Sequence, residues 1–307
     1  MAVSRCKINV FLIKRKQNHK LFTILSTIFA NNHYLCISKP SNIKRNMNIT
    51  IIGAGNIGGA LAKGWSKKNE NTCLTVSGVH WEKLNKIKAE CPNVAVTTDD
   101  AEAVKDADMI VIAVKPWQVE TVLGDISKNI RSNQILVSLA AGVTLADLNT
   151  MVEKAGCEKP SIFYVIPNIA AEFCESMTFI SASENVAKET IEQVETAFKQ
   201  VGDTFVCPEK LIAPGMLMAS CGIAYVMRFL RVQTEAGVEM GFYPNDALKI
   251  AIQTAKGAAE LLHQTGEHPE AAIDRVTTPG GYTIKGLNEM DHAGFNSAVI
   301  RVFKTGL

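Results

Sequence analysis

The sequence lacks any Cys-x-x-Cys pair, and its eight cysteines follow no spacing typical of a zinc site or a disulfide framework. We therefore expect reduced thiols in a cytoplasmic protein and predict no metal site. A strong net charge is also lacking, because 32 Lys and Arg oppose 30 Asp and Glu, for a formal charge of +2. No nucleic-acid partner is expected, and the 47% hydrophobic content is that of a globular protein.

Acidic residues are absent from residues 1–46, which hold nine Lys and Arg, so residues 47–307 carry 23 basic against 30 acidic residues. The apolar run Leu21–Ala30 is too short to cross a membrane, since a helix needs about 20 residues to do so. No membrane partner is predicted. The basic leader resembles a secretory signal without a good cleavage site, or an organelle transit peptide. A third interpretation, which we favour, starts the protein at Met47 and leaves the leader disordered or outside the mature chain.

From Met47 to about residue 208, short β-branched segments alternate with longer segments of helical periodicity. Alternation of this kind predicts an α/β fold with a Rossmann-type, doubly wound parallel sheet over residues 47–208. The predicted strands are Asn48–Ile52, Cys73–Ser77, Asn93–Thr97, Met109–Val114, Gln134–Leu139 and Ser161–Ile166, and the predicted helices between them are Asn56–Ser66, Glu82–Glu90 and Pro116–Ile130.

Strand patterns are missing from residues 209–307, which are rich in Ala, Met, Leu and Val. Leu211–Met240, Pro244–Gln264 and Pro269–Val276 have helical periodicity, with Gly-containing and Pro-containing breaks between them. A helical region this apolar commonly buries its surface against a second copy of itself. We predict an all-helical C-terminal dimerisation and substrate domain, and hence a homodimer.

The segment Gly53-Ala54-Gly55-Asn56-Ile57-Gly58 lies between the first predicted strand and the first predicted helix, and it matches Gly-x-Gly-x-x-Gly. Gly53 permits the tight turn, Gly55 lets the backbone approach a pyrophosphate, and Gly58 lets the helix pack against the strand. The helix N-terminus at Asn56 and Ile57 presents N–H groups to an anion. These five residues predict a dinucleotide-binding domain.

No acidic residue follows the second predicted strand, where one commonly holds the ribose of a coenzyme that lacks the 2′-phosphate. The segment reads Val76-Ser77-Gly78-Val79-His80. We therefore predict NADPH as the coenzyme, with NADH as the alternative. Ser77 and His80 are candidates to contact the 2′-phosphate, although His80 equally fits a solvated loop.

Two more loops follow the fourth and fifth predicted strands. They are expected to flank the nicotinamide, because ligands bind outside the carboxyl ends of parallel strands. Their small residues leave room for a flat ring, although Lys115 also fits a surface position beside a helix start. The candidate cofactor-binding residues here are Ala113, Val114, Lys115, Pro116, Ala140 and Gly142.

A second glycine-rich segment, Thr278-Pro279-Gly280-Gly281-Tyr282-Thr283, precedes a predicted helix that runs to about Asp291. The turn places backbone N–H groups at a helix N-terminus, which is a favourable seat for a carboxylate, and the two threonine hydroxyls can add hydrogen bonds. No side chain in the segment suits covalent attack or metal binding. The alternative is an ordinary capping turn with Thr283 as the cap.

These motifs together resemble pyrroline-5-carboxylate reductase. The resemblance spans residues 47–307 and rests on the first glycine loop, Ala-Val-Lys-Pro, Ala-Ala-Gly-Val, Pro167-Asn168 and Thr-Pro-Gly-Gly-x-Thr in that order. It implies reduction of 1-pyrroline-5-carboxylate to L-proline with NAD(P)H, the last step of proline biosynthesis. It also implies a homodimer through the C-terminal helices, with dimers often assembled into a ring.

The resemblance also implies roles for the second glycine loop. Thr278, with the backbone at Gly280, Gly281 and Tyr282, would hold the substrate carboxylate, and Thr283 would contact the ring nitrogen. The loop is expected to complete the site of the partner's Rossmann domain. The pKa of a threonine hydroxyl lies far above 7, so we assign Thr283 to orientation of the substrate, with the proton coming from solvent or substrate.

Three positions depart from the family pattern. The chain has Ala219-Ser220-Cys221-Gly222-Ile223 where many members have Ser-Gly-Ser-Gly-Pro. Tyr164 stands where an Arg is common before x-x-Pro-Asn. Asp100 stands where a cofactor-contacting Asn follows the third strand, and this acid weakens the NADPH expectation.

Two other interpretations stay open on the residues alone. Another Rossmann imine or 2-hydroxy-acid reductase would share this architecture, and the hydroxy-acid branch would use a lysine such as Lys249 or Lys256. The second is a non-catalytic, nucleotide-sensing protein, against which the presence of both halves of a site argues.

Overall fold

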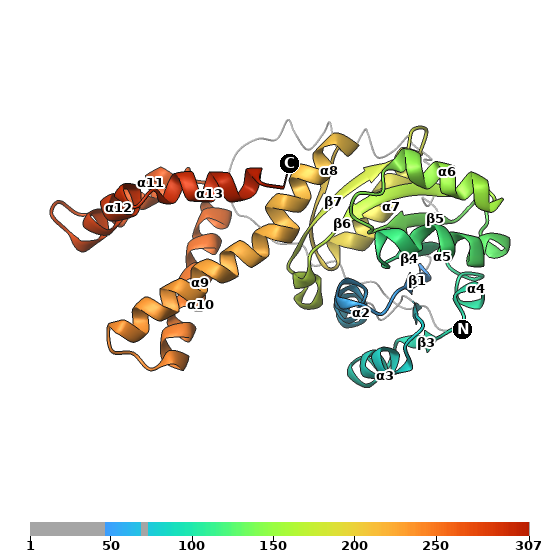
Figure 1. Ribbon diagram of the computed structural model, residues 1–307, viewed down its shortest axis with the longest axis horizontal. Coiled ribbons are helices and arrows are strands. Elements are labelled where there is room, and N and C mark those ends of the chain that lie inside the picture. Colours follow the sequence, from blue (N-terminus) through green and yellow to red (C-terminus); the bar gives the residue numbers. More distant parts are fainter. Residues whose placement is uncertain (1–46, 69–72, 307) are drawn as a thin grey trace, which may run out of the picture. The chain divides into compact units, whose positions relative to one another are not determined.

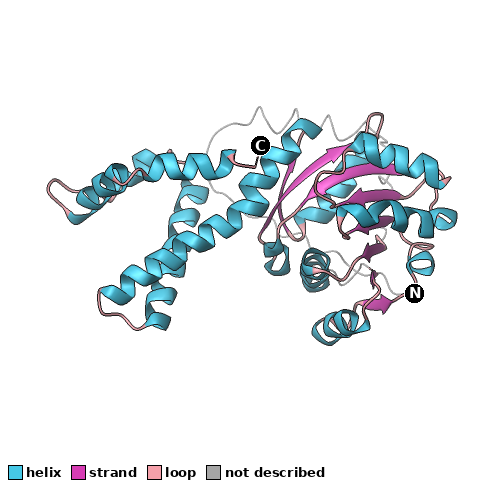
Figure 2. Cartoon of the chain, in the orientation of Figure 1, coloured by secondary structure: helices cyan, strands magenta, loops and turns pink. Residues whose placement is uncertain are grey.

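The computed structural model describes residues 47–68 and 73–306. The predicted basic leader lies outside these residues. These described residues form one compact unit. Within it, strands and their covering helices occupy the N-terminal part and helices alone the C-terminal part (Figure 2).

The N-terminal part is built on one eight-stranded sheet with the strand order β3-β2-β1-β4-β5-β6-β7-β8. The order reverses between β1 and β4, which is the doubly wound arrangement predicted from the sequence. All pairs are parallel except β6 with β7, so the sheet is mostly rather than wholly parallel. The strands are β1 (Ile49–Ile52), β2 (Leu74–Ser77), β3 (Ala95–Thr97), β4 (Met109–Ile112), β5 (Ile135–Ser138), β6 (Ser161–Ile166), β7 (Ser176–Ala182) and β8 (Gly202–Val206).

Helices cover both faces of this sheet (Figure 1). Leu61, Leu84 and Phe198 belong to the apolar cluster on one face, and Leu123 and Leu148 to the cluster on the other. The central strands β1, β4 and β5 are consequently buried along their whole length. The helices are α2 (Asn56–Lys68), α3 (Trp81–Glu90), α4 (Asp100–Ala103), α5 (Val119–Ile126), α6 (Leu145–Ala155) and α7 (Lys188–Lys199), and the 3₁₀ turns are η1 (Pro116–Gln118), η2 (Ser127–Asn129), η3 (Ile169–Phe173) and η4 (Glu209–Leu211).

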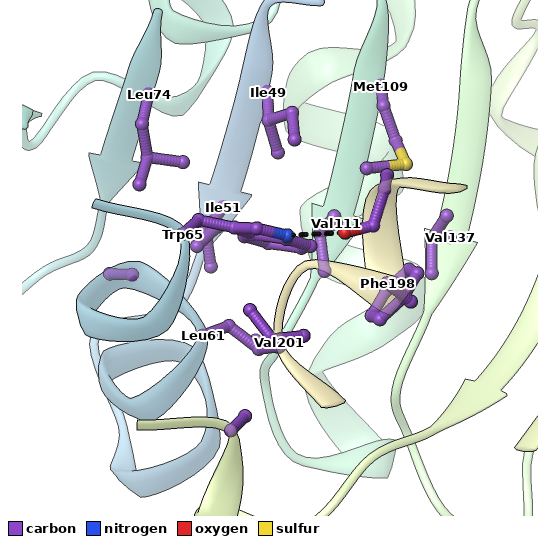
Figure 3. Close-up of a cluster of buried hydrophobic side chains, with 14 of the residues drawn as sticks. Ile49, Ile51, Leu61, Trp65, Leu74, Met109, Val111, Val137, Phe198 and Val201 are labelled. Carbon is purple, nitrogen blue, oxygen red and sulfur yellow. Dashed lines mark hydrogen bonds between the residues drawn. The ribbon is translucent and has the colours of Figure 1, made fainter. Parts of the chain in front are cut away.

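Trp65 ties α2 to the sheet and to α7 (Figure 3). Its side chain has no exposed surface, and its ring meets the ring of Phe198 edge to face at a centroid distance of 5.3 Å. The indole N–H donates a 2.8 Å hydrogen bond to the carbonyl oxygen of Ala197. The polar group of a large buried aromatic is thereby satisfied, so its burial stabilises this layer without an unpaired donor.

The C-terminal part contains only helices among its described residues. Its longest helix starts as α8 (Ile212–Gly215), passes through one π-helical turn, η5 (Met216–Cys221), and continues as α9 (Gly222–Glu239). The sequence predicts this stretch as one regular helix, and the π turn is the difference. The remaining helices are α10 (Pro244–Thr265), α11 (Pro269–Arg275), α12 (Tyr282–His292) and α13 (Phe295–Lys304).

Helices α9 and α10 pack side by side (Figure 1). A Cβ at Gly237 would lie 2.9 Å from the Cβ of Ala247, so the glycine sets how closely the two helices approach. Most of the other apolar side chains on this pair remain exposed, among them Val226, Phe229 and Ile252. The pair therefore has an apolar surface that residues 47–68 and 73–306 do not cover.

By length and composition the segment Glu209–Glu239 also qualifies as a helix that could cross a membrane. One such helix is weak evidence, because packed helices of soluble proteins pass the same test.

Candidate active site

The first glycine loop follows β1 and opens α2. Gly53 has φ +115°, and a Cβ there would lie 2.6 Å from the carbonyl oxygen of Ala113. A Cβ at Gly58 would lie 2.0 Å from the carbonyl oxygen of Gly53. A Cβ at Gly55 would have no protein atom within 4 Å. Packing therefore requires Gly53 and Gly58, whereas Gly55 leaves its backbone accessible to a ligand.

The N-terminus of α2 directly follows this loop, so the free N–H groups of the helix start lie beside the accessible backbone of Gly55. The helical hydrogen bonds begin at the 2.8 Å bond from Gly59 N to Gly55 O. The preceding amides, at Asn56, Ile57 and Gly58, are those that a helix start leaves without an intrahelical partner, so they can bind an anion. No acidic residue lies in the first turn of α2 to repel that anion.

A cavity of about 870 Å³ opens beside this loop at the carboxyl ends of the parallel strands. Its size is that of a site for an extended organic cofactor. The loops after β2, β4, β5 and β6 contribute to its wall, as does the start of α9. Among the predicted residues, Gly53, Gly55, Asn56, Ile57, His80, Ala113, Val114, Lys115, Pro116 and Ala140 line it.

Three predicted cofactor residues do not line the cavity. Gly58 packs on the loop. Gly142 has φ +81° and donates a 2.9 Å hydrogen bond from its N–H to the hydroxyl of Tyr164. Tyr164, the residue in the common arginine position, thus holds the loop after β5. Ser77 is buried, and its hydroxyl donates a hydrogen bond to a carboxylate oxygen of Asp100.

Asp100 follows β3 in the sequence, and its carboxylate lies beside Ser77 at the carboxyl end of β2. It is half-buried at the start of α4 and lines the cavity. Burial raises the pKa of its carboxyl above 3.8, the hydrogen bond from Ser77 opposes that rise, and the neighbouring Asp125 and Asp99 add to it. The sequence shows Asp100, but only the pairing of β2 with β3 shows that it meets Ser77.

The opposite wall comes from η5, α9 and the loop after β6. Ser220 and Cys221 line it, together with the adjacent Asn168 and Ile169. The Ser220 hydroxyl donates a 2.7 Å hydrogen bond to the carbonyl oxygen of Pro167, and the Asn168 amide lies 3.5 Å from the carbonyl oxygen of Ala219. These bonds fasten the π turn to the sheet, and π turns are frequent at functional sites.

These wall residues were missing from the predicted site, although Pro167-Asn168 and the Ala219–Ile223 departure were sequence signals for them.

The C-terminal glycine loop, which the sequence predicts to bind a carboxylate, does not line the cavity of its own chain. Gly280 has φ +72°, and Gly281 donates a 2.9 Å hydrogen bond from its N–H to the carbonyl oxygen of Thr278. Gly281 is the N-cap of α12, so Thr283 is a residue of the helix and not its cap. Tyr282 is 95% exposed. Thr278, Gly280 and Thr283 are exposed as well.

Other candidate groups do not join the site. Lys249 and Lys256 are exposed on α10 and do not line the cavity of their own chain. Within residues 47–68 and 73–306, no three His, Cys, Asp or Glu side chains are placed to hold a metal ion.

Two family models match the chain. The model described as pyrroline-5-carboxylate reductase dimerisation matches residues 209–306, and the model described as NADP oxidoreductase coenzyme F420-dependent matches residues 48–142. The first match includes the apolar segment Glu209–Glu239, and the second includes the first glycine loop.

Several curated relatives are similar over most of this chain. Pyrroline-5-carboxylate reductase 2 of Dictyostelium discoideum is 34% identical, over 85% of this chain and 91% of the relative. The pyrroline-5-carboxylate reductase of Methanosarcina acetivorans is 33% identical, over 83% and 95%. Pyrroline-5-carboxylate reductase 1 of Dictyostelium discoideum is 35% identical over 82% of this chain, which spans about half (47%) of that relative's length.

Solved structures are similar as well. The pyrroline carboxylate reductase of Plasmodium falciparum, with NADP bound, has a TM-score of 0.75 at 25% identity and covers 85% of this chain and 96% of its own. The enzyme of Streptococcus pyogenes has a TM-score of 0.72 at 27% identity, over 85% and 98%. Because whole relatives of this name share a third of its residues and its fold, the chain belongs to the pyrroline-5-carboxylate reductase family of oxidoreductases.

Proposed function

We propose that this chain reduces 1-pyrroline-5-carboxylate to L-proline in the cytoplasm, with a nicotinamide dinucleotide as the reductant and a homodimer as the working unit. The observation that carries the proposal is that the first glycine loop and the start of α9 line the same cavity. One wall binds phosphate, and the other belongs to the segment that matches the dimerisation model.

The dinucleotide fits the residues present, because Gly55 leaves a backbone cradle that any side chain would fill. The amides of Asn56 and Ile57 would hold the pyrophosphate. Small residues at Ala113 and Ala140 would leave space for the nicotinamide ring, and Tyr164 would keep the loop at Gly142 in place. When bound, the reduced nicotinamide supplies the hydride for a C=N bond.

The choice between NADPH and NADH depends on the end of the cavity beside β2 and β3, where Gly78, His80 and Asp100 line it. We call this the ribose end, because it would hold the ribose of the coenzyme. The NADPH expectation rests on the missing acid after β2. Asp100 supplies an acid to that place from α4, so the premise no longer favours NADPH.

The substrate would be oriented by the C-terminal glycine loop. The backbone amides at Gly281 and Tyr282, with the Thr278 hydroxyl, would bind the carboxylate. The Thr283 hydroxyl would hydrogen-bond the ring nitrogen and hold the imine carbon toward the reductant. Most of the rate acceleration then comes from holding two reactants in place, because no residue of the loop is a strong acid or base.

This loop does not line the cavity of its own chain, so we propose that it acts in the cavity of a second copy. The exposed apolar surface of α9 and α10 is the surface that would bring the copies together. A second copy also accounts for the apolar segment Glu209–Glu239 without a membrane. Larger rings of dimers remain a further proposal, tested by sedimentation of the purified protein.

The direct test is oxidation of NADH or NADPH by the purified full chain in the presence of 1-pyrroline-5-carboxylate, with L-proline identified as the product. Oxidation that needs the substrate supports the proposal. If the chain binds a dinucleotide but forms no proline, the non-catalytic alternative replaces it. If a 2-hydroxy acid is turned over instead, the other reductase alternative does.

A further inference from the structure

The ribose end of the cavity holds a fixed acid. Asp100, Gly78, His80 and Lys83 line this end, where β2 and β3 finish. The Ser77 hydroxyl donates to one oxygen of the Asp100 carboxylate. A carboxylate accepts several hydrogen bonds, so it can accept more from a ligand in the cavity.

The placement matches what a Rossmann domain needs in order to bind a ribose without a phosphate. Such domains use an acid at the end of the second strand, whose carboxylate accepts hydrogen bonds from the ribose hydroxyls. Here the strand end offers Ser77, and α4 offers the carboxylate that Ser77 holds. A 2′-phosphate at this place would bring a second negative charge against Asp100.

The basic side chains at this end oppose the charge of Asp100 only weakly. His80 and Lys83 are both exposed, whereas Asp100 is half-buried. Exposed charges are strongly screened by water and salt, and partly buried charges less so. Ser77 cannot offer its single proton to a phosphate while it donates to Asp100.

We propose that Asp100, positioned by Ser77, is the residue that determines coenzyme specificity and makes this chain bind NAD(H) in preference to NADP(H). The inference rests on the proposed function only in that the cavity takes a nicotinamide dinucleotide. It reverses the preference expected from β2 alone, because the acid comes from the neighbouring βα turn.

The test is calorimetric titration of the purified full chain with NAD⁺ and with NADP⁺, without substrate. We expect the wild type to bind NAD⁺ at least about tenfold more tightly, a difference of roughly 1.4 kcal/mol. Asp100→Asn keeps the side-chain shape and removes the charge, so the ratio of the two dissociation constants should fall at least about tenfold. Circular dichroism and thermal unfolding of the variant would confirm that it folds.

The matched control is Asp125→Asn. Asp125 is an exposed acid near enough to affect the pKa of Asp100, but it does not line the cavity. Its removal should leave the ratio within about twofold of the wild type, as expected for a screened surface charge. An equal change in both variants would mean that general charge, and not Asp100, sets the ratio.

Wild-type binding of NADP⁺ as tight as that of NAD⁺ would overturn the inference. An unchanged ratio of the two dissociation constants in Asp100→Asn would also overturn it. In that case, a selective loss of NADP⁺ binding in the double variant His80→Ala with Lys83→Ala would show that these two basic residues determine the specificity. If the wild type prefers NAD⁺ but forms no proline, the proposed function is wrong and the role of Asp100 stands. Proline formation with an unchanged ratio in Asp100→Asn would remove the role of Asp100 alone.

Discussion

The two parts of the chain treat apolar residues in opposite ways. In the sheet region, β1, β4 and β5 are buried throughout, and helices from the same chain cover both faces. In the helical region, α9 buries only Gly222, Thr234 and Gly237, and α10 only Ala247 and Ala251. Large side chains such as Val226 and Ile252 are about half exposed.

From this difference we infer which half of the proposed site is complete in one chain. The sheet region builds its own core and, with it, the first glycine loop and most of the cavity, to which η5 and the start of α9 add the rest. The helical region leaves apolar side chains exposed, and its glycine loop does not line the cavity of its own chain. We infer that the dinucleotide site needs one chain and the substrate site needs two.

The largest expected effect follows from separating the copies. The double substitution Val226→Glu with Ile252→Glu places charges on the exposed apolar surface, and burying an unpaired charge at an interface is strongly unfavourable. We expect a monomer, seen by analytical ultracentrifugation, that still binds NAD⁺ but has lost its reductase activity. Gln253→Glu, which adds a charge at an exposed polar position of α10, should leave the dimer intact. A fully active monomer would contradict the comparison.

The next effect tests the self-contained core. Trp65→Ala removes a fully buried ring and should lower the free energy of unfolding by about 3–5 kcal/mol, measured by urea denaturation. Trp65→Phe keeps a ring but loses the hydrogen bond to Ala197, so it should cost less. By contrast, Met240→Ala, at an exposed position after α9, should change the free energy of unfolding by no more than about 0.5 kcal/mol. If Trp65→Ala and Met240→Ala lowered the free energy of unfolding equally, the comparison between the two regions would be contradicted.

A smaller effect concerns the substrate half. Thr283→Ala should lower kcat/KM for pyrroline-5-carboxylate at least about tenfold, in line with one positioned hydrogen bond of roughly 1–2 kcal/mol. The dissociation constant for NAD⁺ should stay unchanged, because the loop does not line the cavity of its own chain. Thr283→Ser retains the hydroxyl and should restore most of the activity. Wild-type kinetics in Thr283→Ala would remove this residue from the site.

The smallest effect is a dependence of stability on pH at Asp100. Burial raises the pKa of this carboxyl in the folded chain above its ordinary value of 3.8. The folded state therefore binds the proton more tightly, so the group's contribution is present below pH 3.8 and is lost as pH rises through the folded pKa. Asp100→Asn should be slightly more stable than the wild type at neutral pH, with the gain vanishing in acid. A gain that persists in acid would contradict this cause.

Much of the sheet could be predicted from the sequence because β1 to β6 are short apolar runs between turns. The prediction missed β7 and β8, since Ser176–Ala182 contains polar residues and Gly202–Val206 is half exposed at the sheet edge. The antiparallel direction of β7 depends on long-range pairing and leaves no local pattern. Helix α6 was missed although Thr144 and Asp147 form a capping box at its start.

The site divides in the same way. That the first glycine loop and the loops after β4 and β5 line one cavity could be predicted, because the carboxyl ends of parallel strands meet at one edge of the sheet. The contact of Ser77 with Asp100 and that of Tyr164 with Gly142 join residues 23 and 22 positions apart, so only the folded sheet reveals them. The predicted domain division at residues 208 and 209 stays a prediction.

The most direct measurement of the central claim uses a mixed dimer. One chain carries Gly55→Asp, which places a charge where a pyrophosphate would bind. The other carries Gly281→Val, whose Cβ would lie 2.5 Å from the Thr278 hydroxyl and disturb the carboxylate seat. Each variant alone should be inactive, and differently tagged chains should be co-expressed and purified through both tags.

A site shared between copies predicts that the mixed dimer has one intact site and about half of the wild-type activity. A site completed within one chain predicts an inactive mixed dimer, because every chain then carries one defect. Restored activity would support the account, and an inactive mixed dimer that still binds NAD⁺ would contradict it.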